Sequence, residues 1–103
     1  MGPDRLGIKE KIQVPSRYVT ARDADLIIHS EDSTAALEGR SESCLRVDDP
    51  NPLVIVEVVS PGSDTSENYQ RDYVQKTAEY AARGISEYWQ IDPERDWVRV
   101  GIL

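Results

Sequence analysis

A carboxylate lies inside the most apolar run of this sequence. In "PLVIVEVVSPGS", residues Leu53 to Val59 are typical of a strand buried on both faces, and Glu57 interrupts them. Burying an ionised carboxylate without a partner costs several kcal/mol or more. A functional role or a structural partner is therefore expected for Glu57.

A second acid breaks the pattern of an earlier short strand, predicted for Asp25 to His29. Side chains alternate along a strand, so Glu57 shares a face with Ile55, and Asp25 with Ile27. If the two strands are neighbours, their carboxylates converge near the end of the sheet. Such a pair repels unless a cation lies between its members, and hard oxygen ligands suit Mg²⁺ or Mn²⁺.

The residues alone leave another interpretation open. Glu57 could accept hydrogen bonds from a neighbouring backbone, or pair with an Arg or Lys of the following helix. Lys76 has a competing role as well, because Asp72 lies four residues before it and the two can pair on the helix surface. Periodicity does not choose between a metal site and an ion pair.

Hydrophobic periodicity predicts the elements that must position these residues. Strands are expected over 8–14, 25–29, 53–59, 86–92 and 97–103. One or two helical turns are expected over 33–38. The clearest helix runs from a capping-box pattern at Asp64 and Glu67 to a stop at Gly84. This order predicts an α/β fold, a mixed β-sheet packed by at least one helix.

Length and charge limit the classes of protein. The 103 residues suffice for one domain, 1–103, and the net charge of −7 argues against a non-specific nucleic-acid coat. No stretch approaches the ~20 apolar residues of a membrane span. The first 14 residues lack the apolar core of a secretion signal, and Cys44 has no cysteine partner. A cytoplasmic protein that is not embedded in a membrane is expected.

Other polar and aromatic residues have plainer interpretations. His29 reads as a polar residue at a strand end, and Tyr80 as helix–sheet packing. The acidic residues in loop-like sequence read as a solvated surface: Glu31, Asp32, Glu38, Glu42, Asp48 and Asp49.

Four segments carry a resemblance to a known family. "ARDADLIIHS", "PLVIVEVVSPGSD", "RDYVQKTAEYAARGISEYWQIDP" and "WVRV" resemble the Uma2 (Uma-two) family of restriction endonuclease-like proteins. The resemblance spans about residues 17–103. It is most specific from Glu57 through Asp92, where strand, helix and "EYW..DP" follow in the family's order and spacing.

The resemblance implies a PD-(D/E)xK nuclease-like fold and a Mg²⁺-dependent DNA endonuclease. It implies that Asp25 and Glu57 bind Mg²⁺ or Mn²⁺, with the Val58 carbonyl as a further ligand. The lysine of the parent motif, whose place is taken here by Val59, is matched by Lys76 on the next helix. The metal would polarise a phosphodiester and activate water, while Lys76 stabilises charge or orients that water.

The sequence also departs from the family pattern. Ala24 stands where proline is usual, and the N-terminal part of the family fold looks missing or divergent, so a truncated core is expected. Sheet edges left by missing strands favour a homo-oligomer. The second expected function, of a different class, is a non-catalytic remnant that acts as an oligomerising or protein-interaction module.

Overall fold

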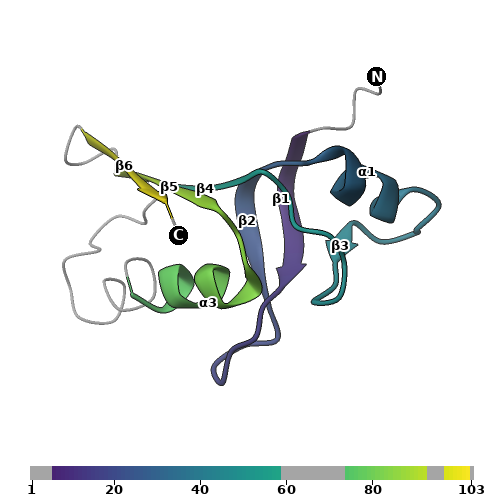
Figure 1. Ribbon diagram of the computed structural model, residues 1–103, viewed down its shortest axis with the longest axis horizontal. Coiled ribbons are helices and arrows are strands. Elements are labelled where there is room, and N and C mark those ends of the chain that lie inside the picture. The colour runs from purple at the N-terminus through teal and green to yellow at the C-terminus, as the bar shows by residue number, and fades with distance from the viewer. Residues whose placement is uncertain (1–5, 59–73, 93–96, 103) are drawn as a thin grey trace.

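A six-stranded mixed sheet forms the body of the protein (Figure 1). The computed structural model describes residues 6–58, 74–92 and 97–102. The strands are β1 Leu6–Gln13, β2 Ala21–Ile28, β3 Cys44–Leu45, β4 Val54–Val58, β5 Glu87–Asp92 and β6 Trp97–Ile102. The described helices are α1 Glu31–Leu37 and α3 Lys76–Arg83.

The strands follow the spatial order β3-β1-β2-β4-β5-β6. The pairs β1–β2, β2–β4 and β5–β6 are antiparallel, whereas β4–β5 and β1–β3 are parallel. This is an α/β architecture consistent with the restriction-endonuclease-like fold, as the resemblance implies. The two-residue β3 was not predicted, because a strand that short carries no alternation to detect.

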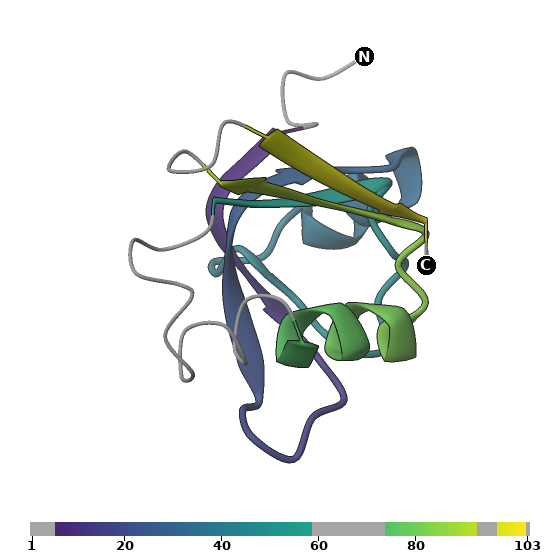
Figure 2. The same cartoon turned by 90° about the vertical axis from the view of Figure 1, so that its left-hand side faces the viewer.

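The core lies between the helices and one face of the sheet. Figure 2 shows α3 beside the twisted sheet, within the curve that the strands make. The core residues are Ile12, Val14, Ala24, Ile27, Leu45, Ile55, Tyr80, Ile85 and Tyr88. Leu37 of α1 packs against the same core. Among the described residues, no helix combines the length and apolar character that a membrane span requires.

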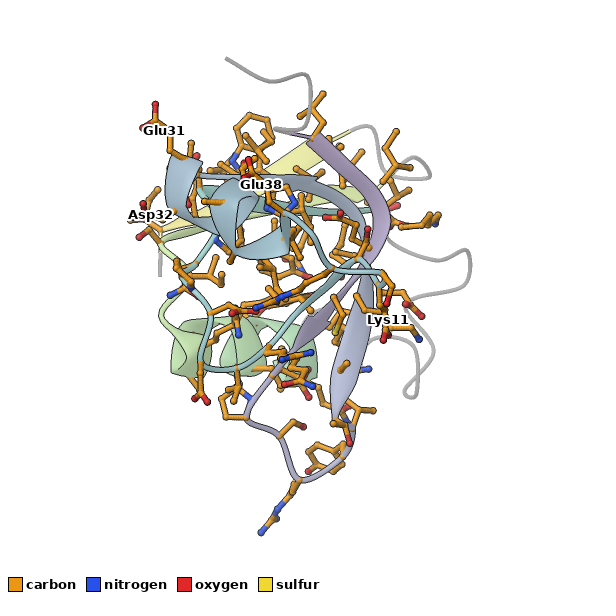
Figure 3. The ribbon with its side chains drawn as sticks, turned by 90° about the vertical axis from the view of Figure 1, so that its right-hand side faces the viewer. Lys11, Glu31, Asp32 and Glu38 are labelled. Atoms are coloured by element: carbon orange, nitrogen blue, oxygen red, sulfur yellow. The ribbon has the colours of Figure 1, made fainter. Side chains whose placement is uncertain are left out.

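The first helix begins earlier than expected because Ser30 caps it. The Ser30 hydroxyl accepts from the Ser33 N–H, and the Ser33 hydroxyl accepts from the Ser30 N–H. Glu31 and Asp32 occupy the first turn, where the helix dipole favours negative charge. Figure 3 shows both acids projecting from the start of α1, in keeping with the solvated surface that was predicted.

The second described helix ends where the sequence predicts. Gly84 adopts φ 96°, a left-handed conformation that closes the helix, and its N–H donates to Ala81. Residues 74 and 75 precede Lys76 in a wider helical turn. The predicted start of this helix, with Asp64 and Glu67, lies outside the described residues.

The direction of the side chains changes along β1 at Lys9. Before it, Gly7 is buried and Ile8 is exposed; after it, Ile12 is buried and Lys11 is exposed. Lys9 itself has φ 56°, a conformation that costs a non-glycine residue on the order of 1 kcal/mol. Ile12, after the reversal, belongs to the core. Lys9 lies opposite Asp25, between the pairs Ile8–Leu26 and Glu10–Ala24.

Candidate metal and catalytic site

Asp25 and Glu57 come from adjacent strands, as predicted. The antiparallel pairing of β2 with β4 includes Leu26 opposite Val56, and one further step along each strand leads to Asp25 and Glu57. At that point Asp25 Oδ2 accepts a hydrogen bond from the Val58 N–H at 2.7 Å. The Asp25 side chain therefore ties the end of β4 to β2.

Glu57 is buried, with 3% of its surface exposed, and faces α3. Its Oε2 accepts a hydrogen bond from the Tyr80 hydroxyl at 2.8 Å and lies 3.4 Å from Lys76 Nζ. Lys76 and Tyr80 are four residues apart on α3, so both reach the same spot. Burial raises the pKa of Glu57, and the Lys76 charge and the Tyr80 hydroxyl offset only part of that effect.

The pKa of Asp25 is shifted in the opposite direction to that of Glu57. Burial alone would raise its pKa, but the contact of Lys9 Nζ with Oδ1 and the Val58 N–H together bring it below its ordinary value. The Lys76 charge adds to this lowering. The two carboxyls are thus shifted in opposite directions, which is common where neighbouring acids are given different roles.

Lys76 points into the protein. Its side chain is 14% exposed and reaches Glu57. The competing partner suggested by the sequence, Asp72, lies outside the described residues. The sequence left open whether Glu57 pairs with a cation of the following helix, and the structure shows that it pairs with Lys76. Asp25 is also close enough to affect the pKa of Glu57.

A buried ion pair anchors α3 beside these residues. Arg22 of β2 donates to Glu79 through Nε at 2.7 Å and through a terminal nitrogen at 2.9 Å. The Ser16 hydroxyl donates to the same carboxylate at 2.6 Å, and Arg22 also reaches Gln75 at 3.3 Å. Such two-point contacts fix orientation as well as distance, so they hold the helix that carries Lys76 against β2.

Sequence reasoning missed Lys9, Arg22, Glu79 and the role of the Tyr80 hydroxyl. Tyr80 was expected to pack, and its ring does lie against Tyr88 with centroids 5.0 Å apart. The hydrogen bond from the Tyr80 hydroxyl to Glu57 had one signal in the sequence. Tyr80 lies four residues after Lys76, so both side chains are on the same face of the helix. The Arg22–Glu79 contact had none, because it joins residues 57 positions apart in the chain.

The oxygen donors fit Mg²⁺ in kind. Mg²⁺ in proteins usually takes one or two carboxylates and completes its shell with water and substrate phosphates. The contacts to Glu57 both fall on Oε2, so a cation would approach at Oε1. Across residues 6–58, 74–92 and 97–102, no three or more His, Cys, Asp and Glu gather as a metal cluster. The two acids therefore fit a site that relies on water and substrate for its other ligands.

His29 is buried with its own partners. One ring nitrogen lies 2.6 Å from Glu10 Oε1 and the other 2.9 Å from the Ser33 hydroxyl. The three side chains resemble an acid–base–nucleophile series, but Ser33 is fully buried and no substrate can reach it. His29 is therefore a polar residue at the end of a strand, as the sequence predicts, and it is buried with its hydrogen-bond partners.

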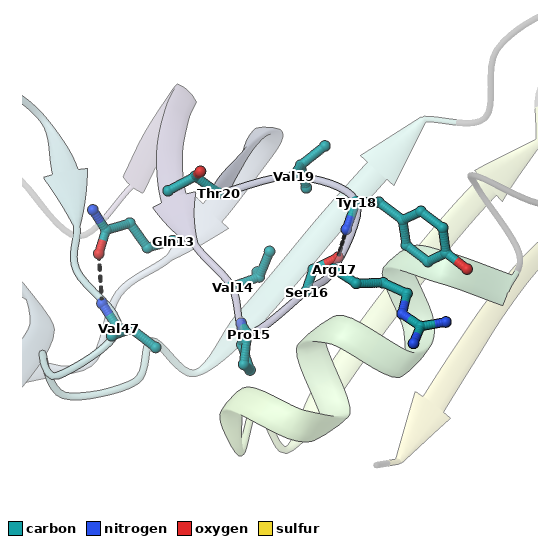
Figure 4. Close-up of a pocket in the computed structure, with 9 residues that line it drawn as sticks. All are labelled: Gln13, Val14, Pro15, Ser16, Arg17, Tyr18, Val19, Thr20 and Val47. Carbon is teal, nitrogen blue, oxygen red and sulfur yellow. Dashed lines mark hydrogen bonds between the residues drawn. The ribbon is translucent and has the colours of Figure 1, made fainter.

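A pocket lies elsewhere, at the loop between β1 and β2. Figure 4 shows that residues 13–20 and Val47 line it. Asp25, Glu57 and Lys76 are not among its lining residues. Ser16 is the link to the site, since its hydroxyl reaches Glu79.

Comparison with known proteins gives one family. The model of the family Uma2, described as "Putative restriction endonuclease", matches residues 11–102. The matched range contains Asp25, Glu57 and Lys76, whereas Lys9 precedes it. The search among curated proteins found no match.

Proposed function

The chain belongs to the Uma2 family of restriction endonuclease-like proteins, and from this premise we propose that it is a Mg²⁺-dependent DNA endonuclease that hydrolyses phosphodiester bonds. The observation that carries the proposal is the convergence of Asp25, Glu57 and Lys76 on one point between β2, β4 and α3. Two acids and a lysine meeting at the end of paired strands supply both a cation site and a fixed positive charge.

Asp25 and Glu57 would hold Mg²⁺ or Mn²⁺, with the Val58 carbonyl as a third oxygen ligand. Bound there, the cation would polarise the phosphodiester and lower the pKa of a bound water. At Oδ1 of Asp25 the cation would compete with the ammonium of Lys9, which contacts that oxygen. Glu57 needs no such release at Oε1, since its contacts with Tyr80 and Lys76 fall on Oε2.

Lys76 would stabilise the negative charge that develops on the phosphate, or orient the attacking water. Its position depends on α3, which the Arg22–Glu79 pair fixes to β2. Tyr80 positions Glu57 through its hydroxyl. These contacts make the site rigid before substrate arrives, which electrostatic stabilisation of a transition state requires.

DNA is the proposed substrate, and the proposed place of action is the cytoplasm. The protein carries a net charge of −7, so binding needs a local excess of positive charge. Lys9 and Lys11 are both exposed on β1. Each pairs with an acid of β2, Asp25 and Asp23, so they become available to phosphate only when a metal ion takes over charge at the carboxylates. Once Lys9 has left Asp25, its ammonium is free to contact a phosphate of the DNA backbone.

Nicking of supercoiled plasmid tests the proposal. Wild type should nick with Mg²⁺ or Mn²⁺ and not with EDTA. Lys76→Met keeps the length of the side chain and removes its charge, so nicking should fall by about 100-fold or more. Arg46→Met, at an exposed residue beyond β3, is the matched control and should nick like wild type.

Two results would overturn the proposal. Equal nicking by wild type and Lys76→Met would mean a contaminating nuclease or another site. Absence of nicking with either metal, in folded wild-type protein, would favour the non-catalytic module instead.

A further inference from the structure

Hydrogen bonds hold the loop that joins β1 to β2. Across its base, the Val14 N–H donates to the Thr20 carbonyl at 3.1 Å. Within it, the Ser16 hydroxyl accepts from the Tyr18 N–H at 3.0 Å and donates to the buried Glu79 carboxylate of α3 at 2.6 Å. Figure 2 shows this loop extending beyond α3, at the end of the β1–β2 hairpin. The rest of the fold therefore positions the loop, as is usual where a loop carries function.

Two neighbouring residues of this loop, Arg17 and Tyr18, are exposed. Tyr18 has 62% of its surface exposed, although it is a large and partly apolar residue. Figure 4 shows both side chains on the same side of the loop. Arginine and tyrosine are both side chains that hydrogen-bond to phosphate and sugar in complexes with DNA.

Arg17 differs from most of the described cations, because those are already paired. Five of them lie against carboxylates: Lys9, Lys11, Arg22, Arg40 and Lys76. Within the described parts of the chain, no carboxylate contacts Arg17, and residues 13–20 include no acid. In a protein with a net charge of −7, this loop therefore offers a phosphate an exposed positive charge without an acid beside it.

Glu79 connects the loop to the proposed active site. The carboxylate that accepts from Ser16 also accepts from Arg22 of β2, the strand that carries Asp25. Lys76 lies three residues before Glu79 on α3, about one helical turn away. These contacts fix the loop relative to both the strand and the helix of the site.

The loop is too far from the carboxylates to touch the bond that is cleaved. Thr20, at its base, lies five residues before Asp25, which is about 17 Å at about 3.4 Å per residue of an antiparallel strand. The phosphates of one DNA strand advance about 3.4 Å each along the duplex axis. A duplex that lies along β2 therefore brings the loop to its backbone about five base pairs from the cleaved bond.

We propose that Arg17 and Tyr18 bind the phosphate backbone of DNA at this distance from the cleaved bond, an inference that rests on the proposed function. The guanidinium of Arg17 donates to a phosphate oxygen, and the Tyr18 hydroxyl donates to the neighbouring backbone. Contacts of this kind fix the position of the duplex and read no sequence. They contribute to binding and not to the chemical step.

The salt dependence of DNA binding tests the proposal. Binding of a fluorescein-labelled 30-base-pair duplex would be followed by anisotropy, with Ca²⁺ in place of Mg²⁺ because it also takes oxygen ligands. Each neutralised phosphate contributes about 0.9 to the slope of log K against log salt, so Arg17→Ala should lower the slope by about 0.9. Arg46→Ala removes the same charge from another exposed arginine and should keep the wild-type slope. Tyr18→Ala removes no charge, so it should weaken binding and also keep that slope.

Nicking kinetics separate binding from chemistry. Because the loop contacts DNA away from the cleaved bond, Arg17→Ala should raise the KM for supercoiled plasmid by about 10-fold at 0.1 M salt and leave kcat within about two-fold of wild type. Lys76→Met should instead lower kcat.

Three results would overturn the proposal: equal slopes for wild type and Arg17→Ala, an equal loss of slope in Arg46→Ala, or no binding of the duplex by wild type at low salt. The proposed active site can fail separately. If Lys76→Met nicks like wild type while Arg17→Ala alone loses slope, the loop binds DNA and only the assignment of the catalytic residues is wrong.

Discussion

Lys9 and Asp25 lie opposite each other on β1 and β2, and the Lys9 ammonium contacts Oδ1 of Asp25. The lysine adopts a left-handed backbone conformation at this position. The contact raises the pKa of Lys9 and helps to lower that of Asp25, so both groups stay charged. The protein therefore supplies its own cation to one of the two proposed metal ligands.

Removal of this lysine should strengthen metal binding. In Lys9→Met, Asp25 loses its competing cation, and we expect Mg²⁺ to bind several-fold more tightly than in wild type. Isothermal titration of Mg²⁺, and the rise in melting temperature that Mg²⁺ produces, would measure this. Lys11→Met is the matched control, since Lys11 is 3.7 Å from the exposed Asp23 on the same strand pair. Equal Mg²⁺ affinity in wild type and both variants would show that Lys9 does not compete for the site.

The sequence could predict the meeting of Asp25 and Glu57 because each acid breaks an apolar pattern in a strand. Their closeness then needs only the assumption that the two strands are neighbours. Lys9 could not be predicted in this way. Its contact depends on the register of the β1–β2 hairpin and on one left-handed residue, which no periodicity reveals.

Glu57→Gln should change the stability of the metal-free protein little. Burial disfavours the ionised carboxylate, and Gln removes that cost while keeping an acceptor for Tyr80. Against this, Lys76 loses its charged partner. We expect the free energy of unfolding at pH 7 to change by no more than about 1 kcal/mol. Urea denaturation in EDTA would measure it.

The same variant separates the two roles open to Glu57. If Glu57 binds Mg²⁺, millimolar Mg²⁺ should stabilise wild type, and the variant should lose most of that gain. If the carboxylate is only the partner of Lys76, its loss leaves a largely buried ammonium unpaired. The penalty in EDTA would then be on the order of 3 kcal/mol, with no effect of Mg²⁺ on wild type.

Tyr80→Phe should disturb Glu57 without disturbing the core. The ring remains against Tyr88, but the hydrogen bond to the carboxylate is lost. The pKa of Glu57 should rise further, and unfolding at pH 7 should become easier by about 1 kcal/mol. NMR titration of the Glu57 carboxyl and urea denaturation would measure both effects. Tyr18→Phe, at an exposed tyrosine, is the control, and equal behaviour of the two variants would contradict the role of the hydroxyl.

The fold could be predicted where local pattern and tertiary structure agree. The strands over 86–92 and 97–103 and the stop at Gly84 match the structure to within about a residue. β2 begins four residues earlier than predicted, at Ala21, because its first residues pair with the end of β1, and Arg22 also contacts Glu79 of α3. Arg22 and Glu79 are 57 positions apart in the chain, so the sequence before Asp25 gave no sign of this contact.

Asp49 should govern the stability of the protein in acid. Two nitrogens of Arg40 donate to its carboxylate at 2.6 and 2.9 Å, and the Arg46 N–H donates at 2.7 Å. These bonds lower the pKa of Asp49 to about 2, although it was expected to be a solvated loop acid. A carboxyl whose pKa is lower in the folded state stabilises that state above its unfolded pKa of about 3.8, and the contribution disappears as pH falls through about 2.

Asp49→Asn should therefore flatten the acid limb of the stability profile. Wild type should lose free energy of unfolding between about pH 4 and pH 2, because the unfolded chain takes up the Asp49 proton first. The variant lacks that proton and should lose less over the same interval. Urea denaturation at intervals across this range would give both curves, with Asp48→Asn, at the exposed neighbouring acid, as the matched control. Parallel curves for wild type and Asp49→Asn would show that the Arg40–Asp49 pair does not contribute to stability in acid.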